Sequence, residues 1–170
     1  LVVAGNETTR NAISHAMLAL IEHPDQRRRL LDDPTLLDAA IEEFLRWASP
    51  VMHFRRTATT DTELRGQAIA AGDRVVIWHI SANRDEAVFE DPFTFDIARS
   101  ADNGRTQVAF GGGGAHYCLG ANLARAEMKV MLQELLARIP DMELDGTVDH
   151  LRSNFINGIK RMPVRYTPTA

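Results

Sequence analysis

Apolar residues recur at helical spacing in several stretches of the chain. In residues 1–23 they return every three or four positions, and Gly5 weakens this predicted helix locally. Residues 24–34 predict a short charged helix bracketed by prolines, and residues 35–47 predict another helix with an apolar face. Residues 119–139 predict a long amphipathic helix, whose apolar residues near one side are Leu123, Met128, Met131, Leu135 and Ile139. These stretches indicate a mainly helical protein.

The middle and the end of the chain lose the helical spacing. Residues 51–80 carry β-branched runs punctuated by glycines, which predicts short strands and turns. Residues 84–109 have few periodic positions, as is typical of a long irregular connection. Residues 148–166 predict a β-hairpin around Asn157 and Gly158. The predicted fold class is therefore α+β, mainly α with small β-sheets.

Length and composition suit one globular domain. Of the 170 residues, 45% are apolar and 25% are charged, which allows a buried core. The net charge of -4 gives no basis for binding nucleic acid or an anionic membrane. The longest apolar run, residues 16–21, is too short to span a bilayer and follows no leader, so we expect a cytoplasmic protein. The chain begins without Met inside a helical pattern, so we expect a fragment whose N-terminal part is missing.

The stretch FGGGGAHYCLG, residues 110–120, contains the chain's only cysteine, Cys118. A lone cysteine cannot form an internal disulfide or supply the several thiolates of a zinc or iron–sulfur site. Cys118 is therefore either buried filler or a single ligand. A thiolate at the start of a helix is stabilised by the helix dipole and by unpaired N–H groups. The glycines would let the backbone lie against a flat ligand such as haem, and His116 could donate to a haem propionate.

Two other functions fit the glycine loop less well. A phosphate-binding P-loop needs a Gly-Lys-Ser/Thr sequence after the glycines, and none follows here. A cysteine nucleophile would need His116 as its base, but a base two residues away on a tight loop is hard to aim at the thiol. Haem ligation and inert packing of Cys118 both stay open on this reasoning.

Three motifs together resemble the cytochrome P-450 family of haem-thiolate monooxygenases. FGGGGAHYCLGANLAR resembles the family's haem-ligand loop, AGNETT at residues 4–9 resembles the oxygen-activating part of its central helix, and EFLR at residues 43–46 resembles its E-x-x-R motif. The motifs occur in the family's order and at its usual separation. The resemblance implies that residues 1–170 form the C-terminal part of a single cytochrome P-450 domain, from the oxygen-binding helix through the cysteine loop to a C-terminal β-hairpin.

The resemblance also implies a role for each matching residue. Cys118 would be the axial ligand of the iron in haem b (iron protoporphyrin IX), and a thiolate ligand favours cleavage of the O–O bond. Glu7 and Thr8 would be the acid–alcohol pair that delivers protons during oxygen activation. Arg56 and His116 would bind the haem propionates. The other residues expected to contact the haem are Ala4, Gly5, Phe110, Gly111, Gly112, Gly114 and Gly120.

The chemistry of the residue types supports two of these roles. Thr8 can bond back to the carbonyl of Ala4, which together with Gly5 would widen the helix locally and open a groove for dioxygen. Glu43 and Arg46 stand three residues apart on one helix face, so they suit a two-point ion pair. In the family this pair is structural and ties the helix to the irregular connection beneath the haem.

The family lines its substrate pocket with a segment that here reads Val51, Met52, His53 and Phe54. Two features depart from the family's pattern. Phe110 stands eight residues before Cys118 where the family's Phe stands seven before it, so we expect the loop to bulge by one residue. The stretch DPFTF, residues 91–95, lacks the arginine that the family usually carries there. The third partner of Glu43 and Arg46 is therefore left open.

The stretches RWASPVMHFRRTAT, SANRDEAVFEDPFTFDIAR and FINGIK look most like actinobacterial members that hydroxylate sterol side chains or methyl-branched lipids. The implied reaction inserts one atom of O2 into a C–H bond of an apolar substrate, with electrons from a ferredoxin and its reductase. Arg125 and Lys129 could help an acidic electron donor dock beside the haem, and a solvated helix face is the alternative. A second hypothesis is a haem-binding, catalytically incomplete remnant without turnover.

Overall fold

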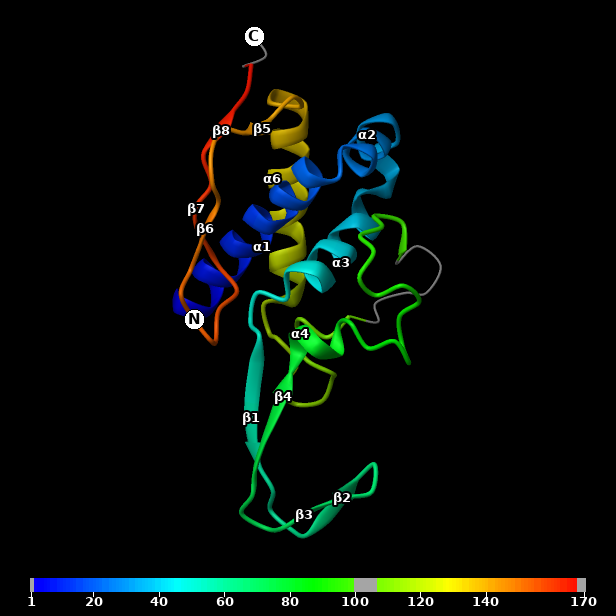
Figure 1. The fold of residues 1–170 in the computed structure, drawn as a ribbon, viewed down its shortest axis with the longest axis vertical. Coiled ribbons are helices and arrows are strands. Elements are labelled where there is room, and N and C mark those ends of the chain that lie inside the picture. The colour runs from blue at the N-terminus through cyan, green and yellow to red at the C-terminus, as the bar shows by residue number, and fades with distance from the viewer. Residues whose placement is uncertain (1, 100–106, 168–170) are drawn as a thin grey trace.

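The computed structural model describes residues 2–99 and 107–167. Three long helices carry its core, and each packs against the other two (Figure 1). They are α1 (Val2–Glu22), α3 (Leu37–Ala48) and α6 (Ala121–Arg138). The long helices predicted from the apolar spacing are confirmed, with ends that differ by one or two residues.

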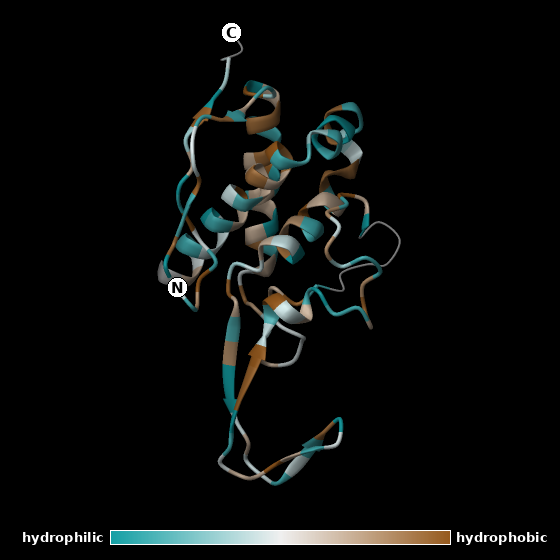
Figure 2. Ribbon diagram, viewed as in Figure 1, coloured by the Kyte–Doolittle hydropathy of each residue, from teal (hydrophilic) through white to brown (hydrophobic). Residues whose placement is uncertain are grey.

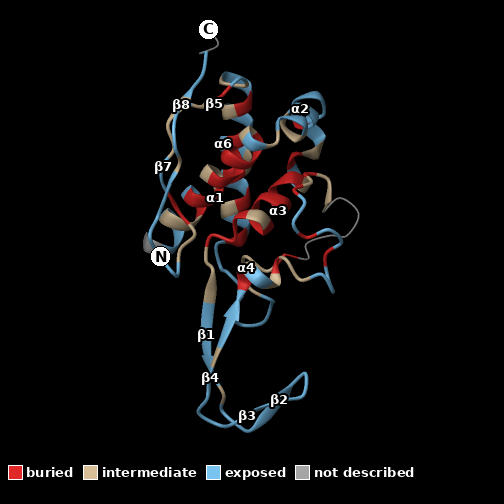
Figure 3. Ribbon diagram, in the orientation of Figure 1, coloured by how far each residue is buried: buried red, intermediate tan, exposed pale blue. Residues whose placement is uncertain are grey.

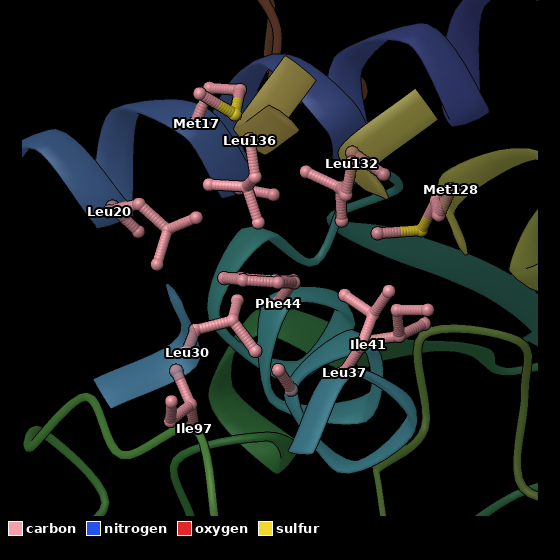
Figure 4. Close-up of a cluster of buried hydrophobic side chains, with 14 of the residues drawn as sticks. Met17, Leu20, Leu30, Leu37, Ile41, Phe44, Ile97, Met128, Leu132 and Leu136 are labelled. Atoms are coloured by element: carbon pink, nitrogen blue, oxygen red, sulfur yellow. The ribbon is translucent and has the colours of Figure 1, made fainter. Parts of the chain in front are cut away.

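One buried apolar cluster joins the three helices. Phe44 of α3 is 1% exposed and lies among Leu20 of α1 and Leu132 and Leu136 of α6 (Figure 4). Burying a side chain of this size contributes about 1.5–3 kcal/mol relative to leaving it exposed. Amphipathic helices of this length depend on such packing, so the cluster explains why these segments are helical.

Short helices connect and follow the long ones. α2 (Pro24–Asp32) begins at a proline, which is favourable in the first turn because its missing N–H is not needed there. The 3₁₀ helix η1 (Pro34–Leu36) is capped by Asp33, whose carboxylate accepts a hydrogen bond from the Thr35 N–H at 3.0 Å. α4 (His79–Ala82) is a single turn that follows the strand β4.

Two paired strands extend away from the helices as a ribbon (Figure 1). The two strands are β1 (His53–Thr57) and β4 (Arg74–Trp78). A second pair, β2 (Thr62–Leu64) with β3 (Gln67–Ile69), lies beyond them. Both pairs are antiparallel, and His53 lies opposite Trp78. Most of this ribbon is exposed (Figure 3), although β4 is apolar (Figure 2) and its Trp78 is 47% exposed. The ribbon therefore presents an apolar strand outside the helical core.

The C-terminal strands pair as a hairpin, but not around the predicted turn. The pairs are β6 (Asp149–His150) with β7 (Ile159–Arg161), and β5 (Glu143–Leu144) with β8 (Val164–Arg165). Asn157 and Gly158 lie at the end of the loop that joins β6 to β7, so the prediction that the hairpin turns at them is wrong. The Asn157 side chain instead donates to the carbonyl of Ala48 at 2.6 Å. A Cβ on Gly158 would lie 3.2 Å from the side chain of Asn11 on α1, so this glycine permits close contact with the helix.

The buried face of α6 overlaps only in part with the predicted one, because Met128 is buried as predicted. Leu123 and Met131 are 64% and 45% exposed, whereas Leu135 and Ile139 are partly buried at the edge of the core. The buried residues of α6 are Ala121, Arg125, Met128, Leu132 and Leu136. These positions keep the helical spacing, but one of them is an arginine. A face chosen from apolar residues alone therefore misses it.

The predicted fold class, mainly α with small β-sheets, is confirmed. The connection after α4 consists of turns and bends over residues 83–98, as predicted, and the part of it at residues 100–106 lies outside the described residues. Within residues 2–99 and 107–167, no helix combines the length and the apolar character needed to cross a membrane.

Candidate functional site

The cysteine loop, residues 107–120, leads directly into α6. The backbone N–H of Cys118 donates to the carbonyl of Phe110 at 3.0 Å, which closes the loop on itself. The Cys118 thiol is exposed and forms no disulfide. Cys118 is therefore not buried among the described residues, and it lies just before the first residue of α6.

Three glycines of this loop adopt left-handed conformations. The φ angle is 95° at Gly111, 104° at Gly113 and 78° at Gly114, a region that residues with side chains rarely adopt. Phe110 stands eight residues before Cys118 and still bonds to its N–H. These three glycines are therefore required by the path of the backbone.

The other two glycines of the loop are candidates for close approach to a flat ligand. Gly112 and Gly120 do not have a positive φ. A Cβ on Gly112 would meet nothing within 4 Å, and a Cβ on Gly120 would lie 4.0 Å from Cys118 Sγ. An exposed free thiol beside an open stretch of backbone fits a haem, whose iron can be held by a single cysteine thiolate. Among the described residues, no cluster of three or more His, Cys, Asp or Glu side chains could hold a metal ion instead.

Thr8 on α1 makes the bond predicted for it, because its Oγ1 donates to the carbonyl of Ala4 at 2.6 Å. The predicted widening does not accompany this bond, since α1 is α-helical over its whole length. A Cβ on Gly5 would meet nothing within 4 Å, so this side of the helix is open. Glu7 accepts a hydrogen bond from Arg10 at 2.7 Å. Among the described residues, no hydrogen bond or ion pair joins Glu7 or Thr8 to the cysteine loop.

Glu43 and Arg46 form the predicted two-point ion pair inside the core. Arg46 Nε donates to Glu43 Oε2 and Arg46 Nη2 to Glu43 Oε1, both at 2.7 Å. Arg46 Nη1 also donates to the carbonyls of Asn83 and Pro92, each at 2.8 Å. The pair therefore ties α3 to the irregular connection that follows α4.

Arg99 is the third partner that the sequence left open. Its Nε lies 3.4 Å from the Glu43 carboxylate, and its Nη2 donates to the carbonyls of Asp91 at 3.0 Å and Thr94 at 2.8 Å. The family pattern places an arginine within DPFTF, whereas this chain supplies one a few residues later, in FDIAR. The arginine in FDIAR was therefore the one feature of the sequence that could have indicated Arg99 as the third partner of Glu43 and Arg46.

Asn83 is a buried residue whose role was not predicted from the sequence. Its Nδ2 donates to Ser49 Oγ at 2.8 Å, and its Oδ1 accepts from the Val108 N–H at 2.7 Å. It therefore joins the end of α3 to the start of the cysteine loop. A single asparagine in a polar stretch carries no periodic signal, so nothing in the sequence marked it.

The docking role predicted for Arg125 is wrong. Arg125 is 9% exposed, and its Nε and Nη2 donate to the Glu42 carboxylate at 2.5 and 3.0 Å. Burial lowers the pKa of Arg125, but its interactions with Glu42 and Tyr117 outweigh that effect and raise the pKa above the usual arginine value. Its charge is thus compensated inside the protein. Lys129 is more exposed, and it pairs with Asp38 at 2.7 Å.

The segment expected to line the substrate pocket meets an aromatic residue of the β6–β7 loop. The Met52 N–H donates to the carbonyl of Phe155 at 2.9 Å, and Val51 forms an isolated β-bridge with the same loop. The Phe155 ring centroid lies 5.7 Å from that of His53 and 5.8 Å from that of Phe54. Phe155 was not predicted as part of this site, because only the fold brings this distant loop beside the segment.

Arg56 is exposed on β1, as a residue that binds a haem propionate must be. Its guanidinium lies 6.0 Å from the Phe54 ring, and no ion pair involves it within the described residues. Burial lowers the pKa of nearby His79, and the charge of Arg56 lowers it further. The Nδ1 atoms of His53 and His79 are buried without a hydrogen-bond partner. His116 is exposed in the cysteine loop. Arg56 and His116 are thus the exposed residues here that fit a carboxylate-bearing ligand.

Comparisons with known proteins agree with this arrangement. The family model described as Cytochrome P-450 matches residues 1–149. The chain is 55% identical over 168 residues to a methyl-branched lipid omega-hydroxylase of Mycobacterium tuberculosis, a match that covers 98% of this chain and 39% of the relative. It is 48% identical over 167 residues to a steroid C26-monooxygenase of the same species, covering 98% of this chain and 37% of that relative. The chain thus spans less than half the length of these curated relatives.

Solved structures have the same fold. The crystal structure of a Bacillus megaterium protein in complex with testosterone matches with a TM-score of 0.91 and 42% identity, over 97% of this chain and 45% of that chain. A Mycobacterium marinum cytochrome P-450 in complex with pseudoionone matches with a TM-score of 0.90 and 47% identity, over 95% of this chain and 38% of that chain. Taken with the motifs and the cysteine loop, these matches establish that the chain belongs to the cytochrome P-450 family.

Proposed function

We propose that residues 1–170 are the C-terminal part of a haem-thiolate monooxygenase domain, with Cys118 as the axial ligand of haem b. The observation that carries the proposal is the exposed, unbridged Cys118 thiol at the end of a loop shaped by positive-φ glycines. When bound, the haem would supply the reductive activation of O2. Arg56 and His116, both exposed, would bind its propionates.

Thr8 and Glu7 would move protons during the reaction. Thr8 Oγ1 donates its own proton to the Ala4 carbonyl, so its lone pairs can accept a hydrogen bond from a water molecule. The Glu7 side chain is 47% exposed and can exchange protons with solvent, while Arg10 holds its Oε2. Protons would therefore pass from Glu7 to water held at Thr8 Oγ1.

The proposed reaction is a hydroxylation. One atom of O2 enters a C–H bond of the substrate, and the other leaves as water after taking up two protons and two electrons. A ferredoxin, reduced by its reductase, would supply the electrons in the cytoplasm. Lys129 is exposed on α6 and would help that donor dock, because its exposed pair with Asp38 is weak.

An apolar lipid or steroid is the proposed substrate class. His53, Phe54 and Phe155 together form an aromatic surface from two distant segments of the chain. Such a surface suits an apolar molecule, because it binds by burying area and not by hydrogen bonds. The names of the two curated relatives, which refer to a methyl-branched lipid and to a steroid, support the same class.

The yield of product per O2 consumed tests this function. The experiment uses the longest form of the protein that its gene encodes, loaded with haem and supplied with ferredoxin, ferredoxin reductase and a methyl-branched fatty acid or a sterol. We expect hydroxylated product, and we expect Thr8→Ala to divert O2 to peroxide and lower the yield roughly tenfold or more. Ser14→Ala is the matched control, because Ser14 Oγ makes the same kind of bond on α1, to the Arg10 carbonyl at 3.0 Å. An unchanged yield in Thr8→Ala would contradict the proposed role.

Haem binding without turnover is the second candidate. It is favoured by one observation, that among the described residues no hydrogen bond or ion pair joins Glu7 or Thr8 to the cysteine loop. Haem titration of the 170-residue chain discriminates between the candidates. For part of a monooxygenase we expect weak and poorly specific uptake, whereas a tight, single-site complex would favour the second candidate.

A further inference from the structure

We propose that Glu42 is a positioning residue that holds both ends of the cysteine loop and thereby fixes the Cys118 thiol, an inference that rests on the proposed role of Cys118 as haem ligand. Glu42 lies on α3 and is 6% exposed. Its carboxylate bonds to Gln107, where the loop starts, and to Arg125, just beyond its end. One buried side chain therefore links α3 to both sides of the loop.

The start of the loop is held through Gln107. Its Nε2 donates to Glu42 Oε2 at 3.0 Å, and its Oε1 accepts from the Ala109 N–H at 2.6 Å. Gln107 is 8% exposed, so its side-chain amide needs partners inside the protein, and both its Nε2 and its Oε1 have one. The amide thus fixes the backbone of the loop relative to α3.

The far side of the loop is held through Arg125. Two hydrogen bonds join its guanidinium to the Glu42 carboxylate, and the guanidinium lies 4.6 Å from the centroid of the Phe110 ring. The Phe110 carbonyl in turn accepts the N–H of Cys118. Contacts therefore run without a gap from Glu42 through Arg125 and Phe110 to the cysteine. A buried charge that loses its partner is strongly destabilised, so Arg125 depends on Glu42 for its place.

A second ion pair joins the same two helices without touching the loop. Asp38 lies one turn before Glu42 on α3, and Lys129 lies one turn after Arg125 on α6; the two are 2.7 Å apart. Their side chains are 73% and 42% exposed, and in the described part of the chain neither bonds to the loop. Asp38→Asn therefore removes a carboxylate charge between the same helices and serves as the matched control.

The test follows the ligation of the haem and not its turnover. Carbon monoxide is added to the reduced, haem-loaded protein, and the position of the Soret band reports whether a thiolate still holds the iron. The spectra are followed over time below the unfolding temperature of each variant. We expect Glu42→Gln and Gln107→Met to lose the thiolate band about tenfold faster than the wild type, within the range typical for groups that orient metal ligands. Asp38→Asn should behave like the wild type.

The outcomes separate this proposal from the proposed function. Equal rates of loss in Glu42→Gln, Gln107→Met and Asp38→Asn would overturn the role of Glu42 while leaving Cys118 as the ligand. Gln107→Met introduces no unpaired charge, so it decides the question alone if Glu42→Gln does not fold. A folded wild-type protein that never shows the thiolate band would overturn the proposed function, and the role of Glu42 with it.

Discussion

Arg46 meets Glu43 through two hydrogen bonds of 2.7 Å in a part of the core where the side chains are 1% and 0% exposed. A planar guanidinium and a carboxylate match each other in this geometry, which is why the pair is held in a single arrangement. The remaining Arg46 donors bond to carbonyls of the irregular connection. The pair is thus the point at which the connection after α4 is fastened to the helical core.

Removing one partner of this pair should destabilise the fold strongly. Glu43→Ala leaves the Arg46 charge buried without its carboxylate, and we expect the free energy of unfolding to fall by about 3–5 kcal/mol in urea denaturation. Glu134→Ala, which breaks the exposed pair with Arg138, should cost less than about 1 kcal/mol. Similar losses of unfolding free energy in the two variants would show that the buried pair stabilises the fold no more than the exposed pair does.

Arg99→Gln should loosen the connection without unfolding the core. Arg99 bonds to carbonyls of the connection and to Glu43, which also accepts from the Asp96 N–H at 3.1 Å. We expect the free energy of local opening at the Asp96 amide to drop by about 1.5 kcal/mol in hydrogen exchange. Arg28→Gln, at an exposed position of α2, is the control. An unchanged exchange rate at the Asp96 amide in the Arg99 variant would show that Arg99 does not hold the connection in place.

The helices of this protein could be predicted from the sequence because their signals are local. Apolar spacing and prolines placed α1, α3 and α6 to within one or two residues. The turn predicted at Asn157 and Gly158 was wrong because Asn157 bonds to Ala48 and Gly158 lies against Asn11, which no local pattern indicates. The predicted buried face of α6 was right for Met128 but missed Arg125, which is buried because α3 supplies Glu42 as its partner.

The residues of the candidate site also fall into those with local signals, which could be predicted, and those with distant partners, which could not. Motifs within a few residues of each other identified the Cys118 loop, the bond from Thr8 to Ala4 and the pair of Glu43 with Arg46. The residues that connect distant segments went unnoticed, and they are Glu42, Asn83, Arg99 and Phe155. Their importance comes from partners that lie far away in the sequence, so a single sequence carries little trace of it.

His15 should make the protein less stable in mild acid. Burial lowers the pKa of His15 below its usual 6.5, only partly opposed by its hydrogen bond to the Asn157 carbonyl, and the charge of His150 lowers it slightly more. The unfolded chain therefore takes up a proton at higher pH than the folded chain does. The free energy of unfolding is highest above the unfolded pKa, and falls by at most about 1.4 kcal/mol per pH unit as the pH drops below it.

Replacing His15 tests this effect. In urea denaturation between about pH 7 and about pH 5, where unperturbed histidines titrate, His15→Gln should lose less stability on acidification than the wild type. Part of the decline should persist, because burial also lowers the pKa of His79. If the variant declined as steeply as the wild type, His15 would not be a source of the acid sensitivity.

Two neighbouring glycines of the cysteine loop should respond differently to alanine. Gly114 has a φ of 78°, so Gly114→Ala should cost about 1 kcal/mol of stability in the protein without haem. Gly112 has no positive φ and open space around it, so Gly112→Ala should leave that stability unchanged. If the open space receives the haem, Gly112→Ala should nevertheless weaken haem binding in a titration. Unchanged haem affinity in Gly112→Ala would place the haem away from this glycine.

The most direct test of the account is the absorption spectrum of the reduced protein under carbon monoxide, with and without Cys118. The longest form encoded by the gene is purified, reconstituted with haem and compared with its Cys118→Ala variant. We predict that the wild type gives the red-shifted Soret band of a thiolate-ligated haem and that the variant lacks it. An identical spectrum in the two proteins, or a wild type that takes up no haem, would contradict the assignment of Cys118 as the iron ligand.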